Sequence, residues 1–171
     1  MASINDVNQF IDTTSPEDTE NKLLTFFCDD QLFGISIAHV VQIVGMQEII
    51  SIPESLDYAK GIIHLRGSII PVIDTSLRLK KPETQYGERT CIIISAIGDL
   101  TTGFIVDGVD EVINVEKDLI VIPPKSSVDT ANQYITGIAT IHGKVILIMD
   151  IQKLFTSSEI EQIGQSGQLQ T

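Results

Sequence analysis

The sequence contains no tryptophan, and aromatic residues make up only 5% of its 171 residues. A core with so few rings must be filled mainly by Ile, Val and Leu, a mixture that favours strands over helices. The hydrophobic fraction of 43% and the charged fraction of 20% are typical of a globular protein. The chain is long enough for one well-packed domain or for two small lobes that share an interface.

Basic residues are scarce as well. The chain has 11 Lys and Arg residues against 23 Asp and Glu residues, and its formal net charge is −12. Nucleic-acid binding requires basic side chains that displace counterions from phosphates, so this composition argues against it. The same excess of negative charge argues against binding to anionic membrane surfaces.

Only two cysteines are present, Cys28 and Cys91, and both lie in apolar, strand-like runs. No Cys-x-x-Cys spacing occurs, and the three histidines lack the spacing of a metal site. The sequence therefore predicts buried thiols in a reducing cytosol, and it predicts neither a metal nor a cofactor.

Long hydrophobic runs are missing, since the longest uninterrupted apolar stretch is Val145 to Met149. This stretch is far too short to cross a bilayer, and the first residues lack the basic start and apolar run of a signal peptide. We expect a cytoplasmic protein with three parts. These are a disordered acidic leader at 1–21, a folded region at 22–156, and a polar C-terminal tail at 157–171 that can form a short helix.

The folded region alternates short apolar runs with turn residues, which predicts an all-β fold, either barrels or a sandwich. Pro71 lies within one predicted strand, so we expect that strand to be at an edge or bulged. The predicted hairpins pair 23–28 with 32–37, 61–65 with 69–73, 90–96 with 101–106, and 135–141 with 144–149.

The sequence also contains an internal repeat. Residues 58–79 align with 134–155 at a constant offset, and residues 34–44 align with 103–113 in the same order. Tyr, Gly and Asp matches carry more weight than apolar matches, because turns and strand ends fix them. The repeat predicts two similar barrels. The matched pairs are Tyr58 with Tyr134, Gly61 with Gly137, Gly67 with Gly143, Asp74 with Asp150, and Gly34 with Gly103.

Asp74 is the one candidate for catalysis. Its run V-I-D-T-S resembles the catalytic turn of an aspartic-type hydrolase, which requires two carboxylates that share a proton. The repeat supplies Asp150, but Ile151 and Gln152 follow it instead of Thr and a small residue. The favoured interpretation is that both aspartates cap short helices after their strands.

Arg66 is one of only three arginines and lies in a tight turn between two apolar strands. It is either a solvated turn charge or a guanidinium presented to a carboxylate, and turn statistics do not separate these two interpretations.

The run GIIHLRGSIIPVID at 61–74 resembles the G-x-x-N-L-R-G-x-x-I-P-V-x-D signature of CheW-like domains, and residues 26–43 and 103–109 support the resemblance. It covers 22–156 and implies two intertwined five-stranded SH3-like β-barrels with short helices. It also implies a non-catalytic adaptor that couples chemoreceptor cytoplasmic tips to the histidine kinase CheA in chemotaxis. In that family a receptor groove lies between the barrels, and the outer surface of one barrel docks on the regulatory domain of CheA.

The resemblance assigns partner contacts to three parts of the chain: the strand that matches V-x-E-I, the L-R-G turn, and positions that look groove-facing. On this basis Val40→Asp or Arg66→Ala is expected to weaken partner binding without unfolding the domain. The implied contact residues are Val40, Gln42, Ile43, Arg66, Gly67, Cys91, Ile92 and Val112.

The chain departs from the family pattern at three places. Gln42 replaces a Glu that pairs with the L-R-G arginine, His64 replaces an Asn, and Thr75-Ser76 replaces Leu-Arg. These departures leave open a diverged CheW paralogue with other protein partners. A CheV-like role, with such a domain fused to a receiver, is not expected, because the remaining residues do not accommodate a receiver.

Overall fold

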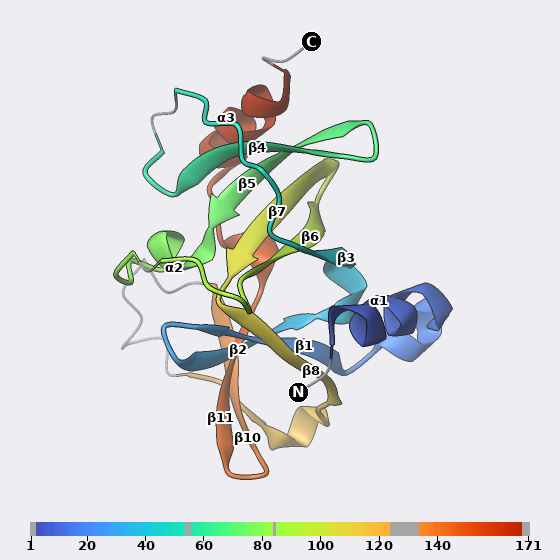
Figure 1. Ribbon diagram of the computed structural model, residues 1–171. Coiled ribbons are helices and arrows are strands. Elements are labelled where there is room, and N and C mark those ends of the chain that lie inside the picture. The colour runs from blue at the N-terminus through green and yellow to red at the C-terminus, as the bar shows by residue number, and fades with distance from the viewer. Residues whose placement is uncertain (1–2, 54–55, 84, 124–133, 169–171) are drawn as a thin grey trace.

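The computed structural model describes residues 3–53, 56–83, 85–123 and 134–168, and strands dominate them (Figure 1). The all-β prediction is confirmed, with two sheets and a few short helices. Sheet A has the order β8-β1-β2-β11-β10-β9, and sheet B has the order β3-β6-β7-β5-β4. All four predicted hairpins are present as β1–β2, β4–β5, β6–β7 and β10–β11.

The strands of sheet A are β1 (Lys22–Cys28), β2 (Gln31–Ser36), β8 (Gly108–Asn114), β9 (Ile120–Val121), β10 (Ile135–Ile141) and β11 (Lys144–Met149). Those of sheet B are β3 (Val40–Gly45), β4 (Ala59–Leu65), β5 (Ser68–Asp74), β6 (Cys91–Ile97) and β7 (Leu100–Val106). The α-helices are α1 (Ile4–Thr13), α2 (Thr75–Arg78) and α3 (Ser157–Gln168). Short 3-10 helices are η1 (Pro16–Thr19), η2 (Ile37–His39), η3 (Lys117–Leu119) and η6 (Ile151–Lys153).

The chain crosses between the two sheets twice. After the β1–β2 hairpin in sheet A the chain crosses to sheet B, where β3 pairs with β6. After the β6–β7 hairpin in sheet B it crosses back, and β8 pairs with β1 in sheet A. Each sheet therefore contains strands from both halves of the sequence, which is the intertwined arrangement that the family resemblance implies.

The internal repeat is visible in the hydrogen bonds. The amide of Asp74 donates to the carbonyl of Tyr58 at 2.8 Å, and the amide of Asp150 donates to the carbonyl of Tyr134 at 2.8 Å. The repeat thus corresponds to two equivalent strand ends, that of β5 in sheet B and that of β11 in sheet A. The parallel pairs agree, because Val72 faces Gly103 in sheet B and Ile148 faces Gly34 in sheet A.

Of the two predicted alternatives for Pro71, an edge or a bulge, the edge position is wrong, while the pairing of its strand with β4 does contain a register shift between Ala59 and Gly61, opposite Ile73 and Val72. The strand of Pro71, β5, lies between β4 and β7 in the interior of sheet B. The parallel pairing with β7 begins at Val72, one residue after the proline. The missing amide of Pro71 therefore costs no bond to β7, so the residue is tolerated in an internal strand.

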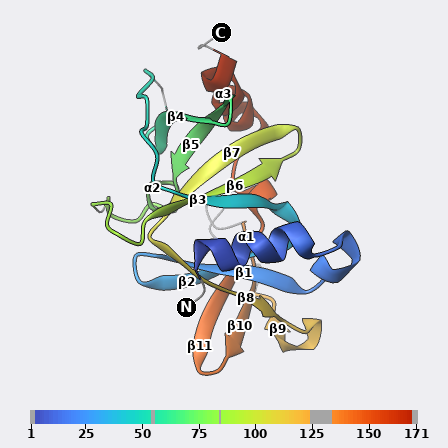
Figure 2. The ribbon, with the colours of Figure 1, turned by 45° about the vertical axis from the view of Figure 1, so that its right-hand side comes forward.

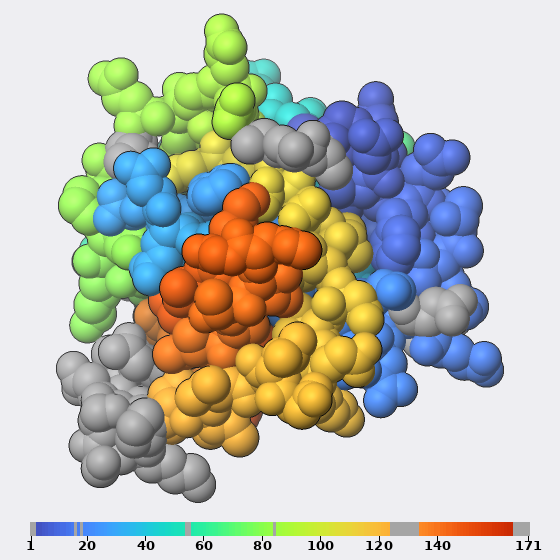
Figure 3. All heavy atoms as spheres, turned by 90° about the horizontal axis from the view of Figure 1, so that it is seen from below, coloured from blue at the N-terminus to red at the C-terminus, as the bar shows by residue number. Residues whose placement is uncertain are grey.

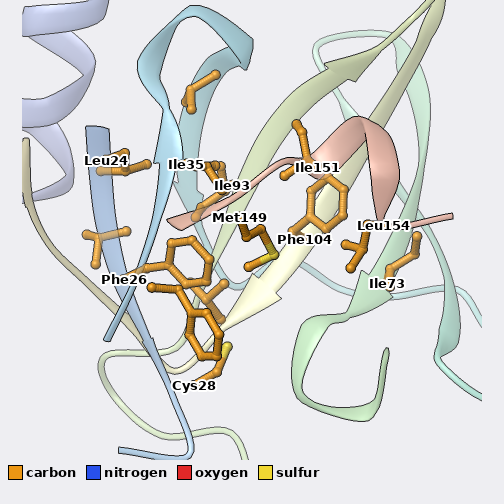
Figure 4. Packing of buried hydrophobic residues seen from close by; sticks show 14 of the residues in the cluster. Leu24, Phe26, Cys28, Ile35, Ile73, Ile93, Phe104, Met149, Ile151 and Leu154 are labelled. Carbon is orange, nitrogen blue, oxygen red and sulfur yellow. The ribbon is translucent and has the colours of Figure 1, made fainter. Parts of the chain in front are cut away.

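One large core joins the two lobes (Figure 4). Leu24 and Phe26 of sheet A, Ile93 and Phe104 of sheet B, and Leu154 after η6 all belong to the same buried cluster. Each lobe adds a smaller cluster of its own, one around Ile92 and Ile94 and the other around Leu23 and Ala139. The lobes are therefore held together by shared apolar burial, not by a thin interface.

The predicted disorder of the leader is wrong for residues 4–13, which form α1. Ser3 and Asp6 form a reciprocal capping box at its start, and Val7 is only 2% exposed. Although residues 1–21 are acidic and polar overall, Ile4, Val7 and Ile11 have the spacing of one helix face and form an apolar stripe. The helix predicted in the tail is confirmed as α3, which extends from 157 to 168. No helix within the described residues is both long and apolar enough to cross a membrane.

Candidate functional site

A groove of about 540 Å³ opens on sheet B beside the tip of the β4–β5 hairpin. Ile70 and Ile94 are buried and form part of its floor, and both belong to the small cluster inside this lobe. Gly164 of α3 closes one side. We call this feature the Arg66 groove; its lining residues are Val41, Gln42, Leu65, Arg66, Ser68, Ile69, Ile70, Pro71, Ile94, Leu100, Thr101 and Gly164.

Among the described residues that line the groove, Arg66 alone is charged. The hairpin turn holds Arg66 at φ 51° and Gly67 at φ 84°, which is the geometry of a tight type I′ turn. Arg66 is exposed, and it takes part in none of the ion pairs found in the described ranges. A guanidinium beside an apolar floor suits an acidic segment of a partner, which it can bind through two parallel hydrogen bonds.

Gln42 lines the same groove as Arg66, so the structure brings together two of the residues that the sequence singled out. A glutamine side chain carries both donors and an acceptor but no charge. It therefore leaves the charge of Arg66 uncompensated, whereas the family's glutamate would neutralise it. Gly67 is exposed in the turn, and its contribution is the positive φ that shapes the hairpin tip.

Val40 and Ile43 do not line the groove. They are 5% and 1% exposed and belong to the large shared core. A register shift between Val40 and Gln42 changes which residues of β3 face outward, and it leaves Val41 47% exposed on the groove. Sequence reasoning missed Val41, because a run of apolar residues gives no signal for the bulge that turns one of them to solvent.

The prediction that Cys91 and Ile92 face a groove is wrong, since they are 1% and 0% exposed. Both lie on β6, between β3 and β7, and each of its faces packs on a different buried cluster. Burial raises the pKa of the Cys91 thiol to about 11 and that of the Cys28 thiol to about 12. Both cysteines are therefore protonated, unreactive core residues at neutral pH.

Val112 lies on β8 of sheet A, is partly buried, and is not among the residues that line the Arg66 groove. It packs against the same cluster that contains Val40 and Ile43. Of the predicted contact residues, Gln42 and Arg66 line the groove and Gly67 lies in the turn beside it. The large shared core contains or packs against Val40, Ile43, Cys91 and Val112, whereas Ile92 belongs to the small cluster within the lobe of sheet B.

Helix α3, which forms one wall of the groove, is fixed by Glu159. The Tyr58 hydroxyl donates to the Glu159 carboxylate, which also accepts the amide of Thr156 at 3.0 Å in a reciprocal cap. Burial by itself would raise the pKa of Glu159, but hydrogen bonds from Tyr58 and Thr156 and the charge of Arg78 outweigh it and lower this pKa. The ionised carboxylate therefore holds the helix on sheet B.

We expect Glu159→Gln to lower the free energy of unfolding by about 1 kcal/mol near neutral pH, because two hydrogen bonds lose their charged acceptor. The folded pKa of Glu159 lies below its unfolded value, so its contribution is present above the unfolded pKa and is lost as pH falls through the folded pKa. Urea unfolding at neutral and at acidic pH measures this difference. Glu161→Gln, at an exposed position of the same helix, is the control and should change stability at neither pH.

Asp74 and Asp150 are helix caps. One oxygen of Asp74 accepts the amide of Leu77 at 3.2 Å, and the other accepts the hydroxyl of Tyr86 at 2.8 Å. Asp150 accepts the amide of Gln152 at 2.9 Å in the other lobe. Both carboxylates thus serve the starts of short helices, as the sequence interpretation favoured. Within the described ranges no group of three His, Cys, Asp or Glu side chains could hold a metal.

A second surface was missed by sequence reasoning. Leu119, Val121 and Ile122 are 54%, 66% and 74% exposed at the β9 edge of sheet A, and we call these three residues the apolar edge. Figure 3 shows this segment beside the β10–β11 hairpin on one face of the molecule. Contiguous exposed apolar residues at a sheet edge are typical of protein–protein contacts. The signal in the sequence was an apolar run followed directly by Pro-Pro.

Comparison with known proteins yields consistent matches. The family model described as the CheW-like domain matches residues 22–159. A chemotaxis protein CheW of Klebsiella aerogenes is 31% identical over 84% of this chain and 87% of its own length. A chemotaxis protein CheW of Treponema pallidum is 31% identical over 86% of this chain and 89% of its own length.

A solved structure has the same fold. The crystal structure of the scaffolding protein TtCheW from Thermoanaerobacter tengcongensis superposes with a TM-score of 0.72 and 35% sequence identity. The match covers 79% of this chain and 92% of the other.

Proposed function

Because this chain belongs to the CheW-like domain family of chemotaxis scaffold proteins, we propose that it couples chemoreceptors to the histidine kinase CheA. In this proposal the protein is a non-catalytic adaptor in the cytoplasm, and it reaches the receptor arrays at the membrane through its partners. The resemblance read from residues 61–74 supports the same role.

The observation that carries the proposal is the Arg66 groove. A single exposed guanidinium lies beside apolar residues, the described part of the lining contains no acidic residue, and Gln42 stands where the family has glutamate. Such a site suits a segment that offers a carboxylate next to apolar side chains. We propose that this segment belongs to the cytoplasmic tip of a receptor.

An adaptor needs a second surface, and the apolar edge offers one on the other sheet. Val121 lies in β9, the edge strand of sheet A, and Leu119 and Ile122 flank that strand, while the groove opens on sheet B. We propose that the apolar edge contacts the regulatory domain of the kinase. Because the two surfaces lie on different sheets, the protein can bind both partners at once.

Co-sedimentation with CheA and with a receptor signalling-tip fragment, pairwise and together, tests the proposal. Retention of both partners in one complex is the expected result. If the folded protein binds neither CheA nor the receptor fragment, the coupling role is contradicted, and a diverged paralogue with other partners is supported.

We expect Arg66→Ala to weaken binding of the receptor fragment about tenfold, since a charge-assisted hydrogen bond contributes roughly 1.5–3 kcal/mol. Thermal stability should stay unchanged, because Arg66 is exposed and lies outside the ion pairs of the described residues. Arg89→Ala is the matched control, because Arg89 is also exposed but lies away from the groove. Equal weakening by both variants would mean that bulk charge, and not the groove, governs binding.

A further inference from the structure

Helix α1 lies across the junction of the two sheets. It contacts β3 of sheet B and β8 of sheet A, and Figure 2 shows it stretched between β3 on one side and β1 with β8 on the other. These are the first strands that the chain forms after each of its two crossings between the sheets. The helix therefore covers the face between the lobes, beside the strand that supplies Val41 and Gln42 to the Arg66 groove.

Asn8 fixes this helix to the free edge of β3. Its side-chain nitrogen donates to the carbonyl of Ile43 at 2.7 Å, and its side-chain oxygen accepts the amide of Ile43 at 2.7 Å. The carboxamide thus replaces the peptide of a neighbouring strand on the one side of β3 that has no strand partner. A side chain that satisfies both groups of one peptide gives the helix a defined position.

The apolar face of α1 covers residues to which the family resemblance assigns partner contacts. Val7 is 2% exposed and belongs to the same buried cluster as Val40 and Ile43. Ile4 and Ile11 of the helix are partly buried against that cluster, as are Phe10 of the helix and Val112 of β8. Four of the eight predicted contact residues therefore belong to this cluster or pack against it: Val40, Ile43, Cys91 and Val112.

The helix is held by docking more than by its own stability. It has ten residues, and isolated helices of this length are marginal in water. Asp12 lies near its C-terminus and no basic residue lies in its last turn, which is unfavourable for the helix dipole. Removal of the docking contacts should therefore release the segment while the sheets remain folded.

We infer that α1 is a displaceable strap, which occupies the face between β3 and β8 that an amphipathic helix of the receptor tip takes when it binds. This inference rests on the proposed function. The partner can bind only those molecules in which the strap has left the face. The apparent affinity for the partner is therefore the intrinsic affinity multiplied by the fraction of molecules in which the face is free. The partner helix must match α1 in chemistry, with an apolar stripe for the shared core and a polar side chain for the Ile43 peptide.

The test measures binding of the receptor signalling-tip fragment to the full chain and to two matched variants. Asn8→Ala removes both hydrogen bonds to Ile43, whereas Asn5→Ala makes the same exchange at an exposed position of the same helix. We expect Asn8→Ala to bind about tenfold more tightly than wild type, and Asn5→Ala to bind like wild type. Amide hydrogen exchange at Ile43 should accelerate in the Asn8 variant alone, with the melting temperature changed little.

Each other outcome has one meaning. Equal affinity of all three proteins, with faster exchange at Ile43 in the Asn8 variant, would overturn the strap and leave the coupling function standing. Weaker binding by Asn8→Ala would also overturn it, because α1 would then be part of the binding surface and not a competitor. No binding by any of the three folded proteins would contradict the proposed function and the strap together.

Discussion

Replacing Gly61 with alanine is expected to destabilise the protein by more than about 4 kcal/mol, a large part of the 5–15 kcal/mol that stabilises a typical domain. Gly61 has φ 140°, a backbone conformation that residues with a side chain rarely adopt. A Cβ atom there would lie 2.1 Å from the carbonyl oxygen and 2.8 Å from the carbonyl carbon of Ile50. Both are backbone atoms, so no rotamer change relieves the clash.

The clash would also break the contact that closes the lobe. Ile50 and Ile62 exchange two backbone hydrogen bonds, of 2.8 and 2.9 Å, across this point. Any shift that makes room for a methyl group at Gly61 separates the segment around Ile50 from β4, to which an isolated bridge joins it. The variant should therefore lose cooperative unfolding or show a strongly lowered urea midpoint.

Gly45→Ala is the matched control for this prediction. A Cβ atom at Gly45 meets nothing within 4 Å, so the substitution should change the free energy of unfolding by less than about 0.5 kcal/mol. Urea unfolding followed by circular dichroism measures both variants. A Gly61 variant within about 1 kcal/mol of wild type would show that the close approach of this segment to β4 is not required for the fold.

The features that local physics dictates were predictable from the sequence. The type I′ turn at Arg66-Gly67 and its counterpart at His142-Gly143 have positive φ at both residues, and Gly tolerates this geometry best. Turns fix hairpins, so all four hairpins and the repeat followed from residue identity. The exposed position of Arg66 followed too, because the tip of a short hairpin projects from its sheet.

The features that depend on long-range packing were not predictable. Nothing in the β3 sequence tells that this strand joins sheet B, or that a bulge turns Val41 outward while Val40 stays in the core. Cys91 and Ile92 lie on an internal strand whose two faces are both covered, and a single apolar run cannot reveal that. The leader was misjudged because its helix is stabilised mainly by packing on β3 and β8 against the shared core, which its acidic composition does not reveal.

The neighbours Val40 and Val41 give the second prediction of large effect, since the same substitution should have opposite consequences at the two positions. Val40→Asp, at a side chain only 5% exposed, should lower the free energy of unfolding by about 4 kcal/mol, because it places a carboxylate in the shared apolar core. This replaces the expectation from the sequence that Val40→Asp weakens binding in a folded domain.

Val41→Asp should leave the fold intact, because the Val41 side chain is 47% exposed. It should weaken binding of the receptor fragment about tenfold, since the new carboxylate lies in the groove with Arg66 and repels an acidic partner segment. Urea unfolding and fragment binding, measured on both variants, separate the two effects. Comparable loss of stability in both would mean that β3 does not present these two side chains to different environments.

The pH dependence of unfolding distinguishes a buried carboxylate from a merely disruptive side chain. Burial raises the pKa of the new Asp in the folded state above its unfolded value, so its destabilising effect grows as pH rises through the unfolded pKa. The stability deficit of Val40→Asp relative to wild type should therefore shrink as the pH is lowered towards about 4. That of Val41→Asp should stay small throughout, because an exposed carboxylate keeps nearly the same pKa in both states. A deficit at position 40 that does not change with pH would mean that the new side chain escapes to solvent, and that β3 is not held against the core as firmly as the burial of Val40 and Ile43 implies.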